Sequence, residues 1–213
     1  MSVSTRFPMR VSASTASSVR KMQRGRANST LFWAVLVVIV ITDVITKAMA
    51  VYALVPQRIP HELLGDTVRF TLVYNPGAAF GLHLGAYSRW IFMVLTIGAL
   101  FVLFRLYRAT RETDLLRTLA IALVSAGAVG NLIDRIRSAQ GVVDFIDVGL
   151  RDARWPTFNV ADMAVSIGAF LLAWVLWGED NQQESANEQG GGDTPPAVTS
   201  MTPANASGGG QDI

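Results

Sequence analysis

The stretch LFWAVLVVIVITDVITKAMAVYAL, residues 31–54, carries only two charged side chains, Asp43 and Lys47. About 20 apolar residues in a helix are enough to cross a bilayer core about 30 Å thick. Three further apolar runs occur at about residues 87–104, 115–133 and 160–177. We therefore expect four transmembrane helices, because lipid offers no hydrogen-bond partner to an open backbone.

The composition of the whole chain agrees with a membrane protein. Of its 213 residues 51% are hydrophobic and only 16% are charged, and the mean hydropathy is +0.36. A soluble domain has about 25% charged residues. With no cysteine, disulfides, thiolate nucleophiles and zinc–thiolate or iron–sulfur sites are excluded. His61 and His83 lack the spacing of a histidine metal site, so no metal or other cofactor is expected.

The ends of the chain differ from its middle. Residues 1–30 carry six Lys/Arg and no acid, and predict a disordered basic tail, although an organelle transit peptide is an alternative. Residues 179–213 are acidic and rich in Gly and Pro, and predict a second disordered tail. The fold class expected for residues 31–178 is an all-α membrane domain of four transmembrane helices, with a small extracytoplasmic platform of strands and loops.

Positive charge indicates how the helices are oriented. Basic residues gather in the N-terminal tail and in the short second connection, at Arg105, Arg108, Arg111 and Arg117. Segments rich in Lys and Arg stay in the cytoplasm. The third connection also holds four arginines, which weakens the rule there, but aspartates are interspersed among them. We expect both termini to be cytoplasmic.

Several polar residues stand where they are costly or unusual. Asp43 and Lys47 are one helical turn apart inside the first span, and suit either an internal ion pair that fixes packing or a pair that positions an active-site group. Asn75-Pro76-Gly77 before the second span is a turn signature by itself. The small residues of Gly77-Ala-Ala-Phe-Gly81 would also let the backbone approach another chain closely.

The third and fourth spans bring further polar groups. Asn131 and Asp134 lie on one helical face at the end of the third span, and Asp144 interrupts the apolar run 142–146. Asn159 and Asp162 open the fourth span, where Asn at the N-cap and an acid three residues later can form a capping box. Taken alone, capping is the simpler interpretation of that pair.

Taken together, Asp134, Asp144 and Asp162 are predicted to fall near one membrane face. If Asp144 and Asp162 approach closely, like-charge repulsion and desolvation favour a pair that shares one proton. One carboxylate can then deprotonate a water while its partner donates to a carbonyl oxygen. Such a dyad is an aspartyl peptidase arrangement, which suits a chain without Ser-His or Cys-His machinery.

At these motifs the chain resembles the lipoprotein signal peptidases, also called signal peptidase II. The resemblance covers about residues 33–177 and rests on five motifs in order. They are Asp43…Lys47, Asn75-Pro-Gly-Ala-Ala-Phe-Gly, Gly130-Asn-Leu-Ile-Asp-Arg, Val-Val-Asp144-Phe-Ile and Phe-Asn159-Val-Ala-Asp162. The family often has Gln after the first-helix Asp, where Val44 stands here, so a hydrogen bond from that position is in doubt.

The resemblance implies both an activity and a set of site residues. The family removes the signal peptide from diacylglyceryl-modified prolipoproteins, just before the lipidated cysteine, and is inhibited by globomycin. Asp144 and Asp162 correspond to its catalytic aspartates, near the outer face of a bacterial cell membrane. The residues that match substrate-binding positions are Asn75, Gly77, Asn131, Arg135 and Asn159, and those with a supporting role are Asp43, Lys47 and Asp134.

The partners expected are a lipidated prolipoprotein and membrane lipids, with no nucleic acid, and the chain is expected to be a monomer. Two other classes compete with the peptidase. A small transporter would also place carboxylates on membrane helices, but near the midplane and often with inverted repeats. A structural assembly partner would leave the Asp144 and Asp162 cluster without a purpose.

Overall fold

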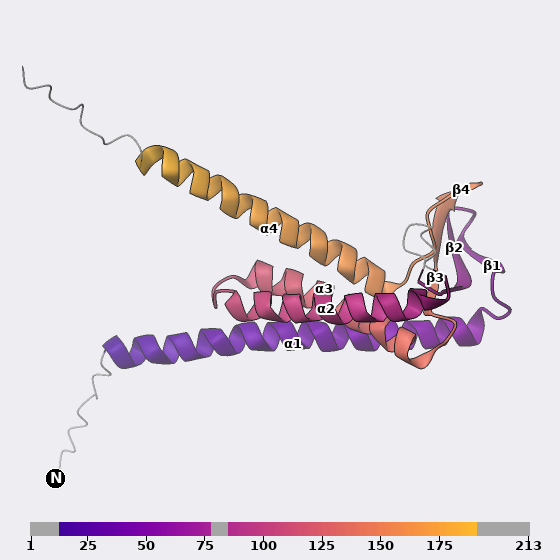
Figure 1. Cartoon of the computed structure of the whole chain (residues 1–213), viewed down its shortest axis with the longest axis horizontal. Coiled ribbons are helices and arrows are strands. Elements are labelled where there is room, and N and C mark those ends of the chain that lie inside the picture. Colours follow the sequence, from indigo (N-terminus) through magenta and orange to yellow (C-terminus); the bar gives the residue numbers. More distant parts are fainter. Residues whose placement is uncertain (1–12, 78–84, 191–213) are drawn as a thin grey trace, which may run out of the picture. The chain divides into compact units, whose positions relative to one another are not determined.

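The structure, a computed structural model, describes the backbone of residues 13–77 and 85–190 and the side chains of residues 28–77, 85 and 87–179. Its described part holds long helices, a single 3-10 turn and short strands (Figure 1). In chain order they are α1 (Ala13–Ala53), β1 (Pro60–Leu64), β2 (Val68–Asn75), η1 (Gly85–Tyr87), α2 (Ser88–Ala109), α3 (Leu115–Arg137), β3 (Val142–Leu150), β4 (Ala153–Arg154) and α4 (Val160–Gly190).

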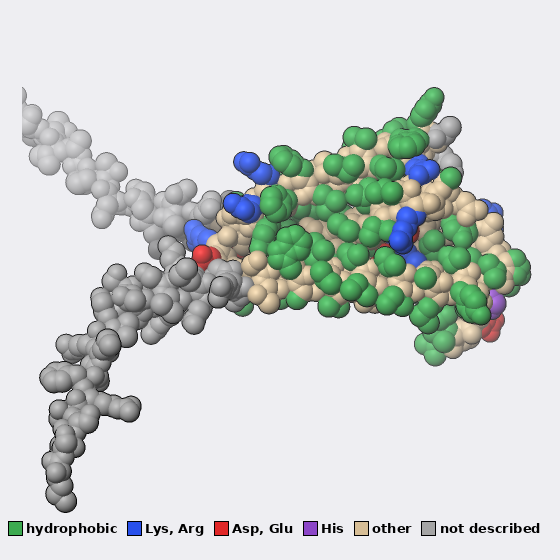
Figure 2. All heavy atoms as spheres, turned by 90° about the horizontal axis from the view of Figure 1, so that it is seen from below, with side chains coloured by type: hydrophobic (Ala, Val, Ile, Leu, Met, Phe, Trp, Pro, Cys, Tyr) green, Lys and Arg blue, Asp and Glu red, His purple; other side chains and the backbone are tan. Residues whose placement is uncertain are grey.

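The four predicted membrane helices are confirmed. Segments long and apolar enough to cross a bilayer are Asn28–Ala53, Ser88–Ala109, Leu115–Arg137 and Val160–Glu179. Large apolar side chains on their outer surfaces are exposed, among them Val38, Val94 and Phe170. Figure 2 shows such side chains over most of the visible helical surface. This surface is suited to lipid rather than water.

Helix α3 is the most buried of the four spans and packs against both α1 and α2. Small residues bring α4 close to it as well. A Cβ on Gly127 would overlap the backbone oxygen of Ala161, and one on Gly168 would lie 2.8 Å from the backbone oxygen of Ala120. At its N-terminus α3 is capped by Asp114, whose carboxylate accepts from the N–H of Arg117 at 3.0 Å.

The first and third connections between spans meet in one antiparallel sheet with the order β1-β2-β3-β4. The β1–β2 hairpin follows α1, and the β3–β4 hairpin follows α3. Strand β2 pairs with β3 so that Val73 lies opposite Asp144 and Asn75 opposite Val142. Because the two connections pair, both lie on the same side of the membrane.

The expected all-α class is therefore too narrow, because the platform is a four-stranded sheet. Its two central strands, β2 and β3, are rich in β-branched and aromatic residues, which favour extended backbone. Helix α1 begins at Ala13, inside the segment expected to be a disordered tail, where Ala, Arg, Lys and Met favour a helix. Helix α4 continues to Gly190. Residues 1–12 and 191–213 lie outside the described part.

The sheet is attached to the helices by an apolar cluster. Ala50 and Leu54 at the end of α1 are buried with Leu72 of β2 and with Val143 and Phe145 of β3. At the far end of the bundle, Phe32 of α1 stacks on Tyr107 of α2, with ring centroids 4.1 Å apart. The first cluster fixes the strand that carries Asp144 against the end of a membrane helix.

Candidate active site

Asp144 and Asp162 come from two different elements at the same end of the helices. Asp144 is the third residue of β3 and is only 3% exposed, within the apolar run Val142–Phe145. Asp162 is the third residue of α4. Polar side chains from α1, α3 and β2 surround the two carboxylates, and their hydrogen bonds can be followed from one side chain to the next.

Asn159 connects the two aspartates directly. Its side chain is completely buried, and its Nδ2 donates to Oδ1 of Asp144 at 2.7 Å. Its Oδ1 accepts from the N–H of Asp162 at 2.9 Å, and Oδ2 of Asp162 accepts from the N–H of Asn159 at 3.2 Å. This reciprocal pair is the geometry of a capping box. The capping and site interpretations of these residues are therefore compatible, because one carboxamide serves both.

Asn131 of α3 holds Asp162 from the other side. Its Nδ2 donates to Oδ1 of Asp162 at 2.7 Å, and its Oδ1 accepts from Nζ of Lys47 at 3.0 Å. Since an ammonium group only donates, Lys47 requires the carboxamide oxygen on its own side. The NH₂ group of Asn131 is thereby directed at Asp162.

Asp43 and Lys47 form the internal ion pair expected in the first span. Nζ of Lys47 lies 2.8 Å from Oδ2 of Asp43, and both side chains are buried. Oδ1 of Asp43 accepts from the N–H of Ala161 at 2.9 Å, so a side chain of α1 also holds the N-terminus of α4. The pair thus fixes packing and positions Asn131, which unites the two interpretations offered by the sequence.

The predicted residue Asp134 joins this network from α3, together with Gly130 of the same motif. Asp134 lies 2.9 Å from Nζ of Lys47 and accepts from the N–H of Val143 at 3.2 Å, next to Asp144 in β3. Gly130 leaves room for Asp43, because a Cβ there would lie 2.5 Å from Oδ2 of Asp43. The end of α3 therefore positions both β3 and the ion pair.

Asn75 reaches Asp144 from the end of β2. Its Nδ2 donates to Oδ2 of Asp144 at 3.2 Å, while its Oδ1 accepts from the N–H of Gly77 at 3.0 Å. Gly77 has a φ of +116°, and a Cβ there would lie 2.8 Å from the ring of Phe92. The predicted turn is thus also the element that directs a carboxamide at Asp144. Residues 78–81 of the motif lie outside the described part.

Arg135 is a predicted site residue at the end of α3. Its guanidinium carbon lies 5.6 Å from the centroid of the Phe92 ring, and Nη1 donates to the backbone oxygen of Asn131 at 3.1 Å. Within the described residues its buried Nε has no hydrogen-bond partner. The structure thus places Arg135 beside the site without a hydrogen bond to either carboxylate.

The electrostatic state of Asp144 is unusual. Burial and then the negative charge of Asp162 raise its pKa to about 7, against hydrogen bonds from Asn75 and Asn159 and the charge of Lys47, which act to lower it. A carboxyl ordinarily has a pKa near 4. Around neutral pH, Asp144 can therefore hold a proton beside a second carboxyl group, as a general acid requires.

Residues 35–178 match the family described as signal peptidase (SPase) II. The chain belongs to the signal peptidase II family. This confirms the resemblance found in the motifs. The lipoprotein signal peptidase of Rhodococcus jostii is 40% identical over 147 residues, which are 67% of this chain and 70% of that protein. The protein of the same name from Halothermothrix orenii is 36% identical over 159 residues, 74% of this chain and 100% of that protein.

Solved structures agree with this assignment to signal peptidase II. A bacterial membrane enzyme determined at 2.3 Å resolution by the in meso method is 30% identical, with a TM-score of 0.64 over 71% of this chain and 90% of that one. A second such structure, at 1.9 Å, is 32% identical with a TM-score of 0.61, over 68% of this chain and 91% of that one.

A cavity of about 540 Å³ opens beside Asp144 and Asn75 of this signal peptidase II chain. Its other walls come from β2 and from the connections around the sheet. They are Gln57, Arg58, Val73, Tyr74, Pro76, Gln140, Pro156 and Thr157. All of these residues lie outside the four membrane-spanning segments. Sequence reasoning missed Gln57, Arg58, Gln140 and Thr157, because polar residues in connections carry no signal that separates a cavity wall from ordinary surface.

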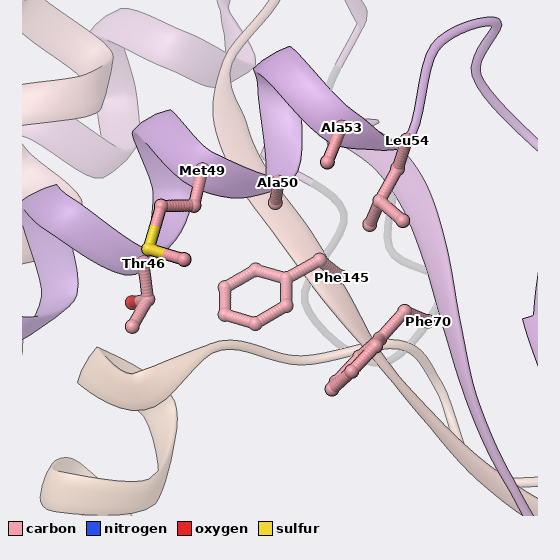
Figure 3. A pocket seen from close by; sticks show the side chains of 7 residues that line it. All are labelled: Thr46, Met49, Ala50, Ala53, Leu54, Phe70 and Phe145. Carbon is pink, nitrogen blue, oxygen red and sulfur yellow. The ribbon is translucent and has the colours of Figure 1, made fainter. Parts of the chain in front are cut away.

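A smaller apolar groove lies on the opposite side of β3, since successive strand residues face opposite ways. It is lined by the last turns of α1 and by Phe70 and Phe145 (Figure 3). Figure 3 shows the Phe145 ring directed at Met49 and Ala50. The residue after Asp144 thus anchors β3 to the membrane helix while Asp144 faces the other way.

Another residue that sequence reasoning missed is Arg89, in the first turn of α2. Its Nε donates to the backbone oxygen of Arg135 at 2.6 Å, and Nη2 donates to that of Ile136 at 3.3 Å. A cation at a helix C-terminus satisfies carbonyl groups that have no partner within the helix. Arg89 therefore holds the end of α3, which carries Asn131 and Asp134.

Proposed function

We propose that this signal peptidase II cleaves diacylglyceryl-modified prolipoproteins just before the lipidated cysteine, with Asp144 and Asp162 as its catalytic residues. The observation that carries the assignment is that Asn159 donates to both carboxyl groups, from its side chain to Asp144 and from its backbone N–H to Asp162, while burial and the charge of Asp162 raise the pKa of Asp144 to about 7. Two adjacent carboxyl groups that hold a single proton can act as acid and base together.

The reaction follows from that single proton. A water between the carboxyl groups attacks the scissile carbonyl carbon and transfers a proton to the carboxylate of Asp162. The protonated Asp144 gives its proton to the carbonyl oxygen, which forms a neutral gem-diol. Asp162 then protonates the leaving amide nitrogen, the C–N bond breaks, and a gem-diol hydroxyl returns its proton to Asp144. Both carboxyl groups finish as they began, and one water is consumed.

The surrounding residues act as positioning groups. Asn159 and Asn75 each donate a hydrogen bond to Asp144, and Asn131 donates to Asp162. These donors fix the rotation of the carboxyl groups, so the free lone pairs face the substrate. Lys47 acts through Asn131, and Asp43 through Lys47 and α4.

The cellular arrangement forms part of the proposal. Both termini are cytoplasmic, the sheet and the dyad lie at the outer face, and the enzyme acts as a monomer that globomycin inhibits. A substrate anchored by a membrane-spanning signal peptide reaches the dyad by lateral diffusion, with its acyl chains against the apolar helices. Residues 31–178 are the catalytic domain, and the segments before and after it are not required. Membership of the family does not favour the transporter interpretation.

The decisive experiment uses the full chain purified in detergent with a lipidated prolipoprotein. Release of the signal peptide is followed by gel shift and mass spectrometry, and the new N-terminus must be the lipidated cysteine. The same precursor without the diacylglyceryl group serves as the comparison substrate. Failure to cleave the lipidated precursor, or cleavage at another bond, would overturn the proposed function.

A further inference from the structure

Part of the cavity beside Asp144 has no role in the reaction described above. Gln57 and Arg58 lie between α1 and β1, Gln140 lies between α3 and β3, and Thr157 lies between β4 and α4. These four side chains offer hydrogen-bond donors and acceptors at the side of the dyad that faces away from the spans. At about 540 Å³, the cavity has the size of a typical ligand site.

On the basis of the proposed function, we propose that this cavity binds the first residues of the mature lipoprotein, after the scissile bond, and that Arg58 selects for acidic side chains there. The signal peptide on the other side of that bond occupies the membrane. Asp162 stands in the first turn of a span, whereas Asp144 and the cavity walls lie outside every span. A chain cleaved between them must continue away from the bilayer, into this cavity.

The charge of Arg58 is available to a substrate. It is exposed and, in the part of the chain that the structure describes, its side chain takes part in no ion pair or hydrogen bond. The sheet arginines differ, because Arg69 and Arg154 lie 3.0 Å and 2.6 Å from the carboxylate of Asp147. Those two arginines are thereby occupied by Asp147, whereas Arg58 is the cation among the described residues that line the cavity.

The backbone of Arg58 is also fixed. Its φ is 68°, in a region that L-residues seldom occupy, and its N–H donates to the backbone oxygen of Leu72 in β2 at 2.9 Å. Such a conformation persists where the surroundings determine it. Arg58 is therefore held at the cavity by the sheet itself.

The test is a set of lipidated prolipoproteins that carry a single Asp or a single Lys at each of the four positions after the cysteine. The readout is the ratio of kcat/KM for the Asp and Lys versions. For the parent enzyme we expect a preference for Asp of roughly threefold to tenfold at one or two positions, the size typical of a partly exposed charge pair. This preference should weaken in 0.5 M salt, because salt screens exposed charges. Arg58→Gln should remove the preference, and Arg58→Glu should reverse it.

Arg137→Glu is the matched control, because it makes the same charge change at an exposed arginine that does not line the cavity. It should leave the ratio as in the parent. Equal cleavage of all substrates by the parent, or an equal shift in Arg137→Glu and Arg58→Glu, would overturn this inference while leaving the proposed function intact. A parent enzyme that cleaves none of the substrates would overturn both.

Discussion

Asn159 caps α4 and also donates a 2.7 Å hydrogen bond to the carboxyl group of Asp144, so the cap of a membrane helix is bonded to a buried carboxyl group of the sheet. The rotation of Asp144 is thereby tied to the end of the span that carries Asp162. Strand β3 and helix α4, which follow one another along the chain with only β4 between them, are thereby joined through one side chain. This relation makes the consequences of several substitutions predictable.

The first prediction concerns the dyad. Asp144→Asn and Asp162→Asn should each reduce cleavage of a lipidated prolipoprotein by at least about 10²–10⁴-fold, because each removes a group that transfers a proton. Neither substitution changes the side-chain volume, so neither creates a cavity or an overlap, even at the buried position of Asp144. The midpoint of thermal unfolding in detergent should therefore change little.

Asp152→Asn is the control for this pair, since Asp152 is an exposed aspartate in the turn between β3 and β4. It should retain parental turnover. Near-parental turnover in Asp144→Asn or Asp162→Asn would show that the substituted residue is not catalytic. For Asp162, capping would then remain as its whole role.

The second prediction concerns pH. Because the pKa of Asp144 is raised to about 7, its acid form is present below pH 7 and is lost as the pH rises above it. The value of kcat/KM should therefore fall about tenfold per pH unit on the basic side of neutrality. This fall, the basic limb of the pH profile, reports the titration of the pair of carboxyl groups rather than of one residue alone.

Asn75→Ala provides the sharper version of the pH experiment. The hydrogen bond from Asn75 lowers the pKa of Asp144, so its removal should move the basic limb to higher pH as well as reduce the rate. Thr71→Val is the control. It removes the 3.0 Å hydrogen bond that Thr71 donates to Asp147, and it should leave the basic limb at the same pH. A limb that stays fixed in Asn75→Ala would contradict the assignment of that limb to the pair of carboxyl groups that contains Asp144.

The third prediction concerns the close approach of α3 to α1. Gly130→Ala should impair both stability and activity, because the new Cβ would lie 2.5 Å from Oδ2 of Asp43 and displace the ion pair with Lys47. Removal of one partner of a buried ion pair costs about 3–5 kcal/mol of stability. Because Gly130→Ala displaces the pair without removing a partner, this range is the upper limit of its expected cost. Thermal unfolding and kcat/KM measure the two effects.

Gly98→Ala is the matched control for Gly130→Ala. It makes the same chemical change within α2, where nothing lies within 4 Å of the added Cβ. It should be neutral or stabilise the helix by roughly 0.5–1 kcal/mol, as Ala favours a helix over Gly. Equal effects of the two substitutions would show that Asp43 tolerates displacement.

Much of this arrangement could be predicted from the sequence, for reasons that individual residues make clear. Apolar runs of about 20 residues define the spans, and Asp43 with Lys47 at i+4 predicts an ion pair within one helix. The link from Lys47 to Asn131 could not be predicted, because residues 84 positions apart meet only through helix packing. The pairing of Asn75 with Asp144 likewise depends on the register of β2 against β3, which short strands do not encode locally.

The boundaries of the sheet show the same limit. The apolar run 142–146 ends before Asp147, but β3 extends to Leu150 because Asp147 is paired with Arg69 and Arg154 on neighbouring strands. Burial acts to raise the pKa of Asp147, yet hydrogen bonds from Arg154, Thr71 and Arg69 outweigh it and lower the pKa. Aspartate is unfavourable in strands by its intrinsic propensity, yet Asp147 lies within β3 because residues on the neighbouring strands pair with its carboxylate.

The last prediction concerns the side of the membrane that carries the site. The β1–β2 and β3–β4 hairpins share one sheet, so a cysteine at Gln57 and one at Ser138 should react alike, and Thr110 at the C-cap of α2 should behave oppositely. The chain has no native cysteine, so a membrane-impermeant thiol reagent gives no background. In intact cells Gln57→Cys and Ser138→Cys should be labelled, whereas Thr110→Cys should react only after the membrane is permeabilised. Labelling of Thr110→Cys in intact cells would place the dyad in the cytoplasm, where a translocated precursor does not present its cleavage site.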